Sequence, residues 1–143
     1  MKITIKRVDP TLPLPERKTK GAVAFDFYSR ETVVIAPGTI GYVPLNAIIK
    51  VPEGYVLYIY ARSGTHKKGL LHGNGVGVID SDFCGNEDEI RSPYFNFSKE
   101  PVTVSRGERI SQGIIQKKED VEWDEVSAME GSSRGAFGTT GAF

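Results

Sequence analysis

One segment of the sequence combines glycines and acidic residues in a way that suits catalysis on a small ligand. Residues 73–83 read GNGVGVIDSDF, with three alternating glycines ahead of Asp80. Glycines let a ligand approach the backbone, so main-chain N–H and C=O groups could recognise a small planar molecule. Asp80 could then act as a general base, or it could pair with Asp82 to bind a metal ion. The alternative interpretation is a surface turn that carries two aspartates.

A second segment has the residue types of an anion site. Ala61, Arg62, Ser63 and Gly64 end a strongly apolar run and precede a possible short helix. Free N–H groups and a hydroxyl at a helix start can hold an anion, and Arg62 would add charge-assisted hydrogen bonds to phosphate. Alternatively, Ser63 simply caps the helix and Arg62 is a surface residue.

A polar residue also interrupts an apolar strand pattern near the end of the chain. In RISQGII (109–115), strict alternation places Gln112 on one buried face with Ile110 and Ile114. A buried glutamine must find hydrogen-bond partners, so Gln112 could orient a ligand or a water molecule. Its partners could equally be backbone groups.

Residues 131–143, GSSRGAFGTTGAF, have too little apolar area to fold alone, and we expect a flexible tail. Arg134, the threonines and free N–H groups could bind phosphate, and closure of the tail over a ligand would exclude water. The alternative is a disordered end with incidental residues.

The elements that must position these segments are short strands. Glycine and proline turns at this spacing predict a sandwich, jelly roll or barrel and not a βαβ arrangement. Apolar alternation or β-branched runs place strands at 3–5, 32–36, 40–51 (interrupted by Pro44), 55–61, 76–79, 94–97, 102–104 and 110–115. One short helix is expected at 63–68, and residues 1–130 are expected to form a single β domain.

Composition narrows the function classes. The 143 residues carry 18 basic and 18 acidic side chains, so no general attraction to nucleic acid or anionic lipid is expected. The single cysteine, Cys84, excludes an internal disulfide framework. No apolar run approaches a membrane span or a signal peptide, so we expect a cytoplasmic protein. His66 and His72 are expected to face solvent, and Trp123 to be a packing anchor.

Five segments together resemble the five motifs of the homotrimeric dUTP pyrophosphatases (dUTPases), in the same order. They are VAFDFYS (23–29), ARSG (61–64), GNGVGVIDSDFCG (73–85), RGERISQ (106–112) and RGAFGTTG (134–141). The resemblance covers nearly the whole chain. It implies an all-β, distorted jelly-roll (β-clip-like) subunit with one short helix and a flexible C-terminal arm, assembled as a trimer with sites at subunit interfaces. It also implies hydrolysis of dUTP to dUMP and pyrophosphate with Mg²⁺, which lowers dUTP and supplies dUMP for dTMP synthesis.

The same resemblance implies a role for each matching residue. Asp80 matches the carboxylate that activates the water attacking the α-phosphorus, and Gln112 matches the glutamine that helps to hold this water. The other matching residues are expected to contact the substrate. In the body, the phosphates would be bound by Arg62, Ser63 and Gly64, the uracil by Asn74, Gly77, Val78 and Ile79, and the deoxyribose by Phe83, at a position where tyrosine is usual. In the arm, Arg134 would bind the γ-phosphate, Phe137 would stack on the uracil ring, and the phosphates would also be bound by Gly138, Thr139 and Thr140. Asp26 and Arg109 are expected to be scaffolding and interface residues. Mg²⁺ is expected to be held through phosphates and water, without direct protein ligands.

Two alternatives have distinct tests. The dCTP deaminase group shares the fold and the trimer, but it typically shows a second serine where this chain has Arg-Ser-Gly, and a different loop in place of GVIDSD (77–82). A catalytically silent nucleotide-binding or regulatory module is the other alternative. The presence of both Asp80 and Gln112 favours an enzyme over that module.

Overall fold

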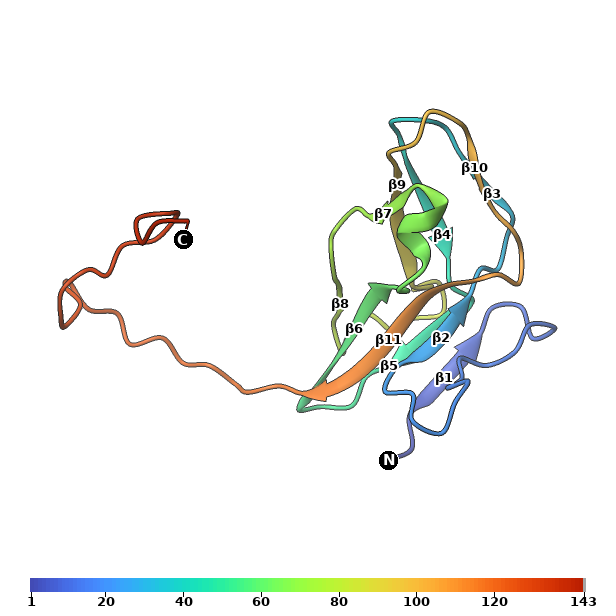
Figure 1. The fold of residues 1–143 in the computed structure, drawn as a ribbon. Coiled ribbons are helices and arrows are strands. Elements are labelled where there is room, and N and C mark those ends of the chain that lie inside the picture. The colour runs from blue at the N-terminus through green and yellow to red at the C-terminus, as the bar shows by residue number, and fades with distance from the viewer. Residues whose placement is uncertain (143) are drawn as a thin grey trace.

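Short strands build almost the whole body of the chain in a computed structural model, which describes residues 1–142 (Figure 1). One short 3₁₀ helix, η1 (Thr65–Lys68), lies among them. The strands are β1 (Thr4–Arg7), β2 (Phe25–Tyr28), β3 (Val33–Ile35), β4 (Ile40–Pro44), β5 (Ala47–Lys50), β6 (Tyr55–Ala61), β7 (Leu70–His72), β8 (Gly77–Ile79), β9 (Arg91–Asn96), β10 (Val102–Val104) and β11 (Arg109–Lys117). Residues 118–142 form an arm that extends away from this body (Figure 1).

The strands pair antiparallel in small sheets whose members come from distant parts of the sequence. A four-stranded sheet has the order β2-β11-β6-β8, a three-stranded sheet has the order β4-β9-β7, and β1-β5 and β10-β3 form two further pairs. The core includes Phe27 and Leu57 from the first sheet and Val43 and Tyr94 from the second. The predicted all-β, jelly-roll class is therefore confirmed.

Pro44 interrupts the apolar run at 40–51 as predicted, because β4 ends there and β5 begins at Ala47. Between them Asn46 adopts a φ of 59°, in the left-handed region that asparagine tolerates better than most residues. Its side chain accepts a hydrogen bond from the Asp9 amide at 2.6 Å and donates to the Asp9 carbonyl at 3.0 Å. The corner is thereby fixed to the N-terminal segment.

The short helix differs from the prediction at its start. The 3₁₀ turn begins after Gly64, and no side chain caps it, so the interpretation of Ser63 as a cap is wrong. Thr65 organises the turn instead: its buried hydroxyl accepts a hydrogen bond from the Arg62 amide at 3.1 Å. Ser63 remains exposed.

The alternation predicted for β11 is also wrong at one point. Pairing with β2 shifts between Arg109 and Ser111, which marks a β-bulge. Ile110 and Ser111 are consequently both buried, whereas Gln112 is only half-buried. The buried Ser111 hydroxyl lies 2.7 Å from the Tyr94 hydroxyl and 3.0 Å from the Ser92 hydroxyl.

Two other side chains lie where the sequence did not place them. His66 is exposed as expected, but both ring nitrogens of His72 are buried and have no hydrogen-bond partner among residues 1–142. The His72 ring packs edge-on against Tyr94, because the short strand β7 turns Leu71 outward and His72 inward. Trp123 is 90% exposed on the arm, so it is not a packing anchor within residues 1–142. No helix within residues 1–142 is both long and apolar enough to cross a membrane.

Candidate active site

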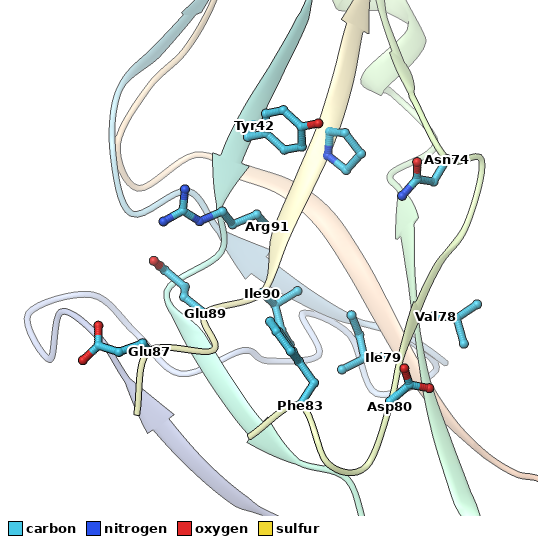
Figure 2. A pocket seen from close by; sticks show the side chains of 11 residues that line it. Tyr42, Asn74, Val78, Ile79, Asp80, Phe83, Glu87, Glu89, Ile90 and Arg91 are labelled. Atoms are coloured by element: carbon cyan, nitrogen blue, oxygen red, sulfur yellow. The ribbon is translucent and has the colours of Figure 1, made fainter. Parts of the chain in front are cut away.

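The turn that follows β7 and the strand β8 border a cavity of about 590 Å³, here called the β8 cavity. The two strands belong to different sheets. Five residues singled out in the sequence line it: Asn74, Val78, Ile79, Asp80 and Phe83 (Figure 2). The opposite wall comes from β4, β9 and the loop before β9, through Tyr42, Glu87, Glu89, Ile90, Arg91 and Pro93. The structure thus gathers the predicted catalytic base and the residues matched to uracil and deoxyribose recognition, except Gly77, which is absent from the lining.

Local pairing explains why Asp80 stands at the edge of this cavity. β8 pairs with β6 through Leu57 and Ile79, and the strand ends at Ile79, so Asp80 is the first residue beyond the ladder. Its side chain is exposed. Phe83 follows on the same loop, is 40% exposed, and directs its ring toward Ile90 (Figure 2).

The structure explains why glycine occurs at two of the three alternating positions. Gly75 adopts a φ of +71°, which a tight turn requires and which side chains disfavour. At Gly77, an added Cβ would lie 3.3 Å from the Cβ of Ile59, so the glycine allows β8 to pack closely on β6.

Arg62, Ser63 and Gln112 line a different cavity of about 340 Å³. Its other residues are Lys18, Thr19, Ala22, Val23, Ala24, Asp26 and Arg109. Gln112 donates a hydrogen bond from Nε2 to the Ala61 carbonyl at 3.0 Å, which leaves the amide oxygen available to a ligand or water. Sequence reasoning missed Lys18 and Thr19, which lie on a loop without periodicity and carry no motif signal.

Asp26 organises the charges of this second cavity. Its carboxylate is almost buried, at 9% exposure, and accepts hydrogen bonds from Arg62 Nε at 3.0 Å and from Arg109 at 2.9 Å. Arg62 also donates to the Arg109 carbonyl at 3.1 Å. The two guanidinium groups are thereby held side by side with a net positive charge, an arrangement that can attract phosphate.

One chain does not bring Asp80 and Gln112 together. Gln112 pairs with Tyr60 on one side of β6, whereas Asp80 follows Ile79, which pairs with Leu57 on the other side. At about 3.3 Å per residue the two levels differ by more than about 10 Å along β6, with that strand between them. The predicted pairing of these two side chains at one water molecule is absent within the single chain that the structure describes.

The arm that carries the residues matched to substrate extends away from the strand body (Figure 1). Arg134, Phe137, Gly138, Thr139 and Thr140 are all exposed. Tight turns shape the segment: Phe137 and Gly138 have φ values of 53° and 88°, and the Thr139 amide donates to the Ala136 carbonyl at 3.3 Å. Within residues 1–142, none of these five residues lines either cavity.

The acidic pair considered as a metal site also borders a third cavity. Asp80, Ser81 and Asp82 line it together with Lys118, and its volume is about 360 Å³. Within residues 1–142, no group of three or more histidine, cysteine, aspartate or glutamate side chains lies at metal-binding distance.

A family model for dUTPase matches residues 11–141 of the chain, which include all five segments singled out above. The chain belongs to the dUTPase family. It is 38% identical to a deoxyuridine 5'-triphosphate nucleotidohydrolase of Thermobifida fusca, with 99% of this chain and 79% of that protein aligned. It is 40% identical to the corresponding protein of Corynebacterium diphtheriae, with 97% and 92% aligned. The resemblance read from the sequence, and the predicted enzyme class, are confirmed.

Solved dUTPase structures share the fold. The dUTPase from Streptococcus mutans superposes with a TM-score of 0.76 at 31% identity, covering 83% of this chain and 98% of that one. The Staphylococcus bacteriophage 80alpha dUTPase with dUPNHPP superposes with a TM-score of 0.83 at 24% identity, covering 98% of both chains.

Proposed function

We propose that this member of the dUTPase family hydrolyses dUTP to dUMP and pyrophosphate. The observation that carries the proposal is the β8 cavity, where an exposed carboxylate, Asp80, shares one wall with Asn74 and Phe83. The Thermobifida fusca and Corynebacterium diphtheriae relatives are named for this activity, and the bacteriophage 80alpha structure contains dUPNHPP. Removal of dUTP and supply of dUMP for dTMP synthesis would follow from the reaction.

The segment from Asn74 to Ile79 suits recognition of uracil, and Phe83 suits recognition of deoxyribose. Uracil differs from cytosine in its N3–H donor and O4 acceptor, which fixed backbone groups of Gly77, Val78 and Ile79 and the Asn74 amide can distinguish. Thymine would be excluded because its methyl group would lack space beside the β8 backbone. The ring of Phe83 would exclude a ribose 2'-hydroxyl by bulk, as a tyrosine ring would.

The reaction needs a base, a positioned water and charge neutralisation. Asp80 accepts a proton from water as the water oxygen bonds to the α-phosphorus, and the bond from this phosphorus to the bridging oxygen breaks to release pyrophosphate. Gln112 helps to hold the water, while Arg62, Ser63 and Gly64 bind the phosphates. Phosphoanhydride hydrolysis depends mainly on such positioning and electrostatic stabilisation.

Mg²⁺ suits the oxygen atoms that meet near the end of β8. Mg²⁺ prefers oxygen ligands and is commonly held by substrate phosphates and waters. The exposed carboxylates of Asp80 and Asp82 border one cavity, where they can accept hydrogen bonds from waters of such an ion. The ion would neutralise phosphate charge when it is bound. A phage phi11 dUTPase structure is described as coordinating a structural Mg(II) ion. In this chain we propose that phosphates and waters hold the ion.

We further propose a homotrimer in which subunits complete each other's sites. Asp80, Gln112 and the arm lie in three separate places in one chain, and only another copy can bring them to one nucleotide. An exposed apolar face on the three-stranded sheet supports this proposal: Ile40 and Leu71 flank Phe95 in register and are 51% and 50% exposed. Exposed apolar clusters of this kind commonly mark protein interfaces.

One assay separates the candidate functions. Incubation with dUTP and with dCTP, each with Mg²⁺, should give pyrophosphate from dUTP and no ammonia from dCTP. Ammonia release would identify a deaminase, and no product from either nucleotide would favour the silent binding module. A cytoplasmic location is part of the proposal and rests on the single free cysteine, Cys84, which suits a reducing compartment.

A further inference from the structure

The cavity around Ser63 and Gln112 contains three cations, and one of them is not tied to the buried carboxylate. Arg62 and Arg109 share Asp26, at 3.0 and 2.9 Å, so one of their two charges is cancelled. Lys18 lines the same cavity from the loop between β1 and β2. It is the one cation of the three whose carboxylate partner, Glu16, lies outside the cavity lining.

Lys18 rests in a surface ion pair that a phosphate can replace. Its ammonium pairs with Glu16, whose side chain is exposed to a similar degree, and lies 5.7 Å from the centroid of the Tyr28 ring. Glu16 also accepts a hydrogen bond from the Tyr28 hydroxyl, so it keeps a donor when Lys18 moves away. Exposed pairs contribute little stability and are screened by salt. The hydrogen bond to Glu16 raises the pKa of Lys18, so the ammonium is charged at neutral pH.

The loop that carries Lys18 is fastened to the charged centre of the cavity. Glu16 and Asp26 form an isolated β-bridge, with N–H to O distances of 3.3 and 2.9 Å. Arg17 closes the loop by donating from Nε to the Val23 carbonyl at 3.2 Å. Lys18 is thus held two residues from the bridge that fixes Asp26.

We propose that Lys18 is a substrate-binding residue that contacts the outer phosphates of the nucleotide, and the pyrophosphate that leaves, in the cavity shared with Ser63 and Gln112. The inference rests on the proposed hydrolysis of dUTP. An ammonium is a compact charge with three donors, which suits a terminal phosphate group with several free oxygens. Lys18 therefore distinguishes nucleotides by the number of their phosphates, and contributes nothing to base selection.

The test compares ligands with and without the outer phosphates. Lys18→Ala should raise the KM for dUTP and the inhibition constant of pyrophosphate by about tenfold, the effect of losing one charge-assisted contact. Inhibition by dUMP should stay within about twofold of wild type, since dUMP lacks the outer phosphates. Lys18→Arg should recover most of the loss. Lys20→Ala, an exposed lysine of the same loop outside the cavity lining, is the matched control and should behave as wild type.

Glu16→Gln separates phosphate binding from a merely structural ion pair. This variant removes the pair but keeps the Lys18 ammonium, so the KM for dUTP should stay the same or fall. A KM raised as much as in Lys18→Ala would overturn the proposal, as would equal constants for Lys18→Ala and Lys20→Ala. If wild type released no pyrophosphate from dUTP, the proposed function would fail. Calorimetric binding of pyrophosphate to wild type and Lys18→Ala would then still decide the role of Lys18.

Discussion

Asp80 illustrates how a chemical role depends on where a strand stops. The β8 strand ends at Ile79, so the carboxylate of Asp80 is exposed at the rim of the β8 cavity and lies outside the sheet. Asp26, by contrast, lies within β2, is almost buried and is occupied by two arginines. Two aspartates of one chain thus have different surroundings, one exposed and one bound by two arginines, because their positions relative to the strands differ.

Replacing Asp80 with asparagine tests the proposed base. The change keeps the size of the side chain but removes its proton acceptor, so kcat for dUTP should fall by at least about 10²-fold, the usual contribution of a general base. Binding of a non-hydrolysable dUTP analogue should persist, because Asn74 and the backbone of β8 are unchanged. Turnover would be followed by pyrophosphate release, with Asp88→Asn, a change on the same loop outside the cavity lining, as control. Undiminished kcat in Asp80→Asn would show that another group takes the proton.

His72 makes stability depend on pH. Burial lowers the pKa of His72 below its ordinary 6.5, so below that pH the unfolded chain binds more protons than the folded chain. This contribution to stability should therefore be fully present well above pH 6.5 and should decrease as the pH falls below 6.5. His72→Phe, which keeps an aromatic ring against Tyr94, should reduce this slope in melting temperature, whereas His66→Asn at an exposed site should keep it. Parallel slopes in wild type and His72→Phe would refute the assignment.

Strands with one clear signal could be predicted from sequence, and those with mixed surroundings could not. β6 is an unbroken apolar run, and Pro44 separates β4 from β5 as its missing N–H requires. β2 escaped prediction because three of its four residues are buried, so it lacks alternation. The bulge near Ile110 escaped because it depends on pairing with β2, a partner more than 80 residues away.

The candidate site divides in the same way. Five ordered motifs identified its residues, including Asp80, Ser63 and Gln112. Their separation into two cavities could not be read from the sequence, because it follows from the strand order β11-β6-β8, in which β6 stands between Gln112 and Asp80. Lys18 could not be found at all, since a lysine in an irregular loop has no pattern to distinguish it.

Gly113 tests how tightly β11 packs on the core. An added Cβ would lie 2.7 Å from the Phe27 ring and 3.2 Å from Leu57, so Gly113→Ala overpacks a buried layer and should lower the free energy of unfolding by about 1–3 kcal/mol. Gly21→Ala, where no atom lies within 4 Å, should change it by less than about 0.5 kcal/mol. Urea unfolding midpoints would measure both. Equal midpoints would mean that the layer yields without strain.

At the scale of the whole molecule, the separated cavities are the reason for the proposal that subunits share their sites. An isolated chain holds a base-recognition cavity with Asp80 and a phosphate cavity with Ser63 and Gln112, but no place where both meet one nucleotide. The arm adds a third component that contacts neither. Closed symmetry resolves this economically, because each of three identical interfaces then joins one cavity of each kind.

Mixed trimers test this arrangement directly. Asp80→Asn and Gln112→Ala should each be nearly inactive alone. When the two variants are unfolded together in equal amounts and refolded, a site that takes Asp80 from one subunit and Gln112 from its neighbour finds both intact with a probability of about one quarter. Pyrophosphate release from dUTP should therefore recover to about a quarter of the wild-type rate, with each variant refolded alone as control. If both side chains acted from the same chain, no mixture could restore a site, and activity would stay at the level of the separate variants.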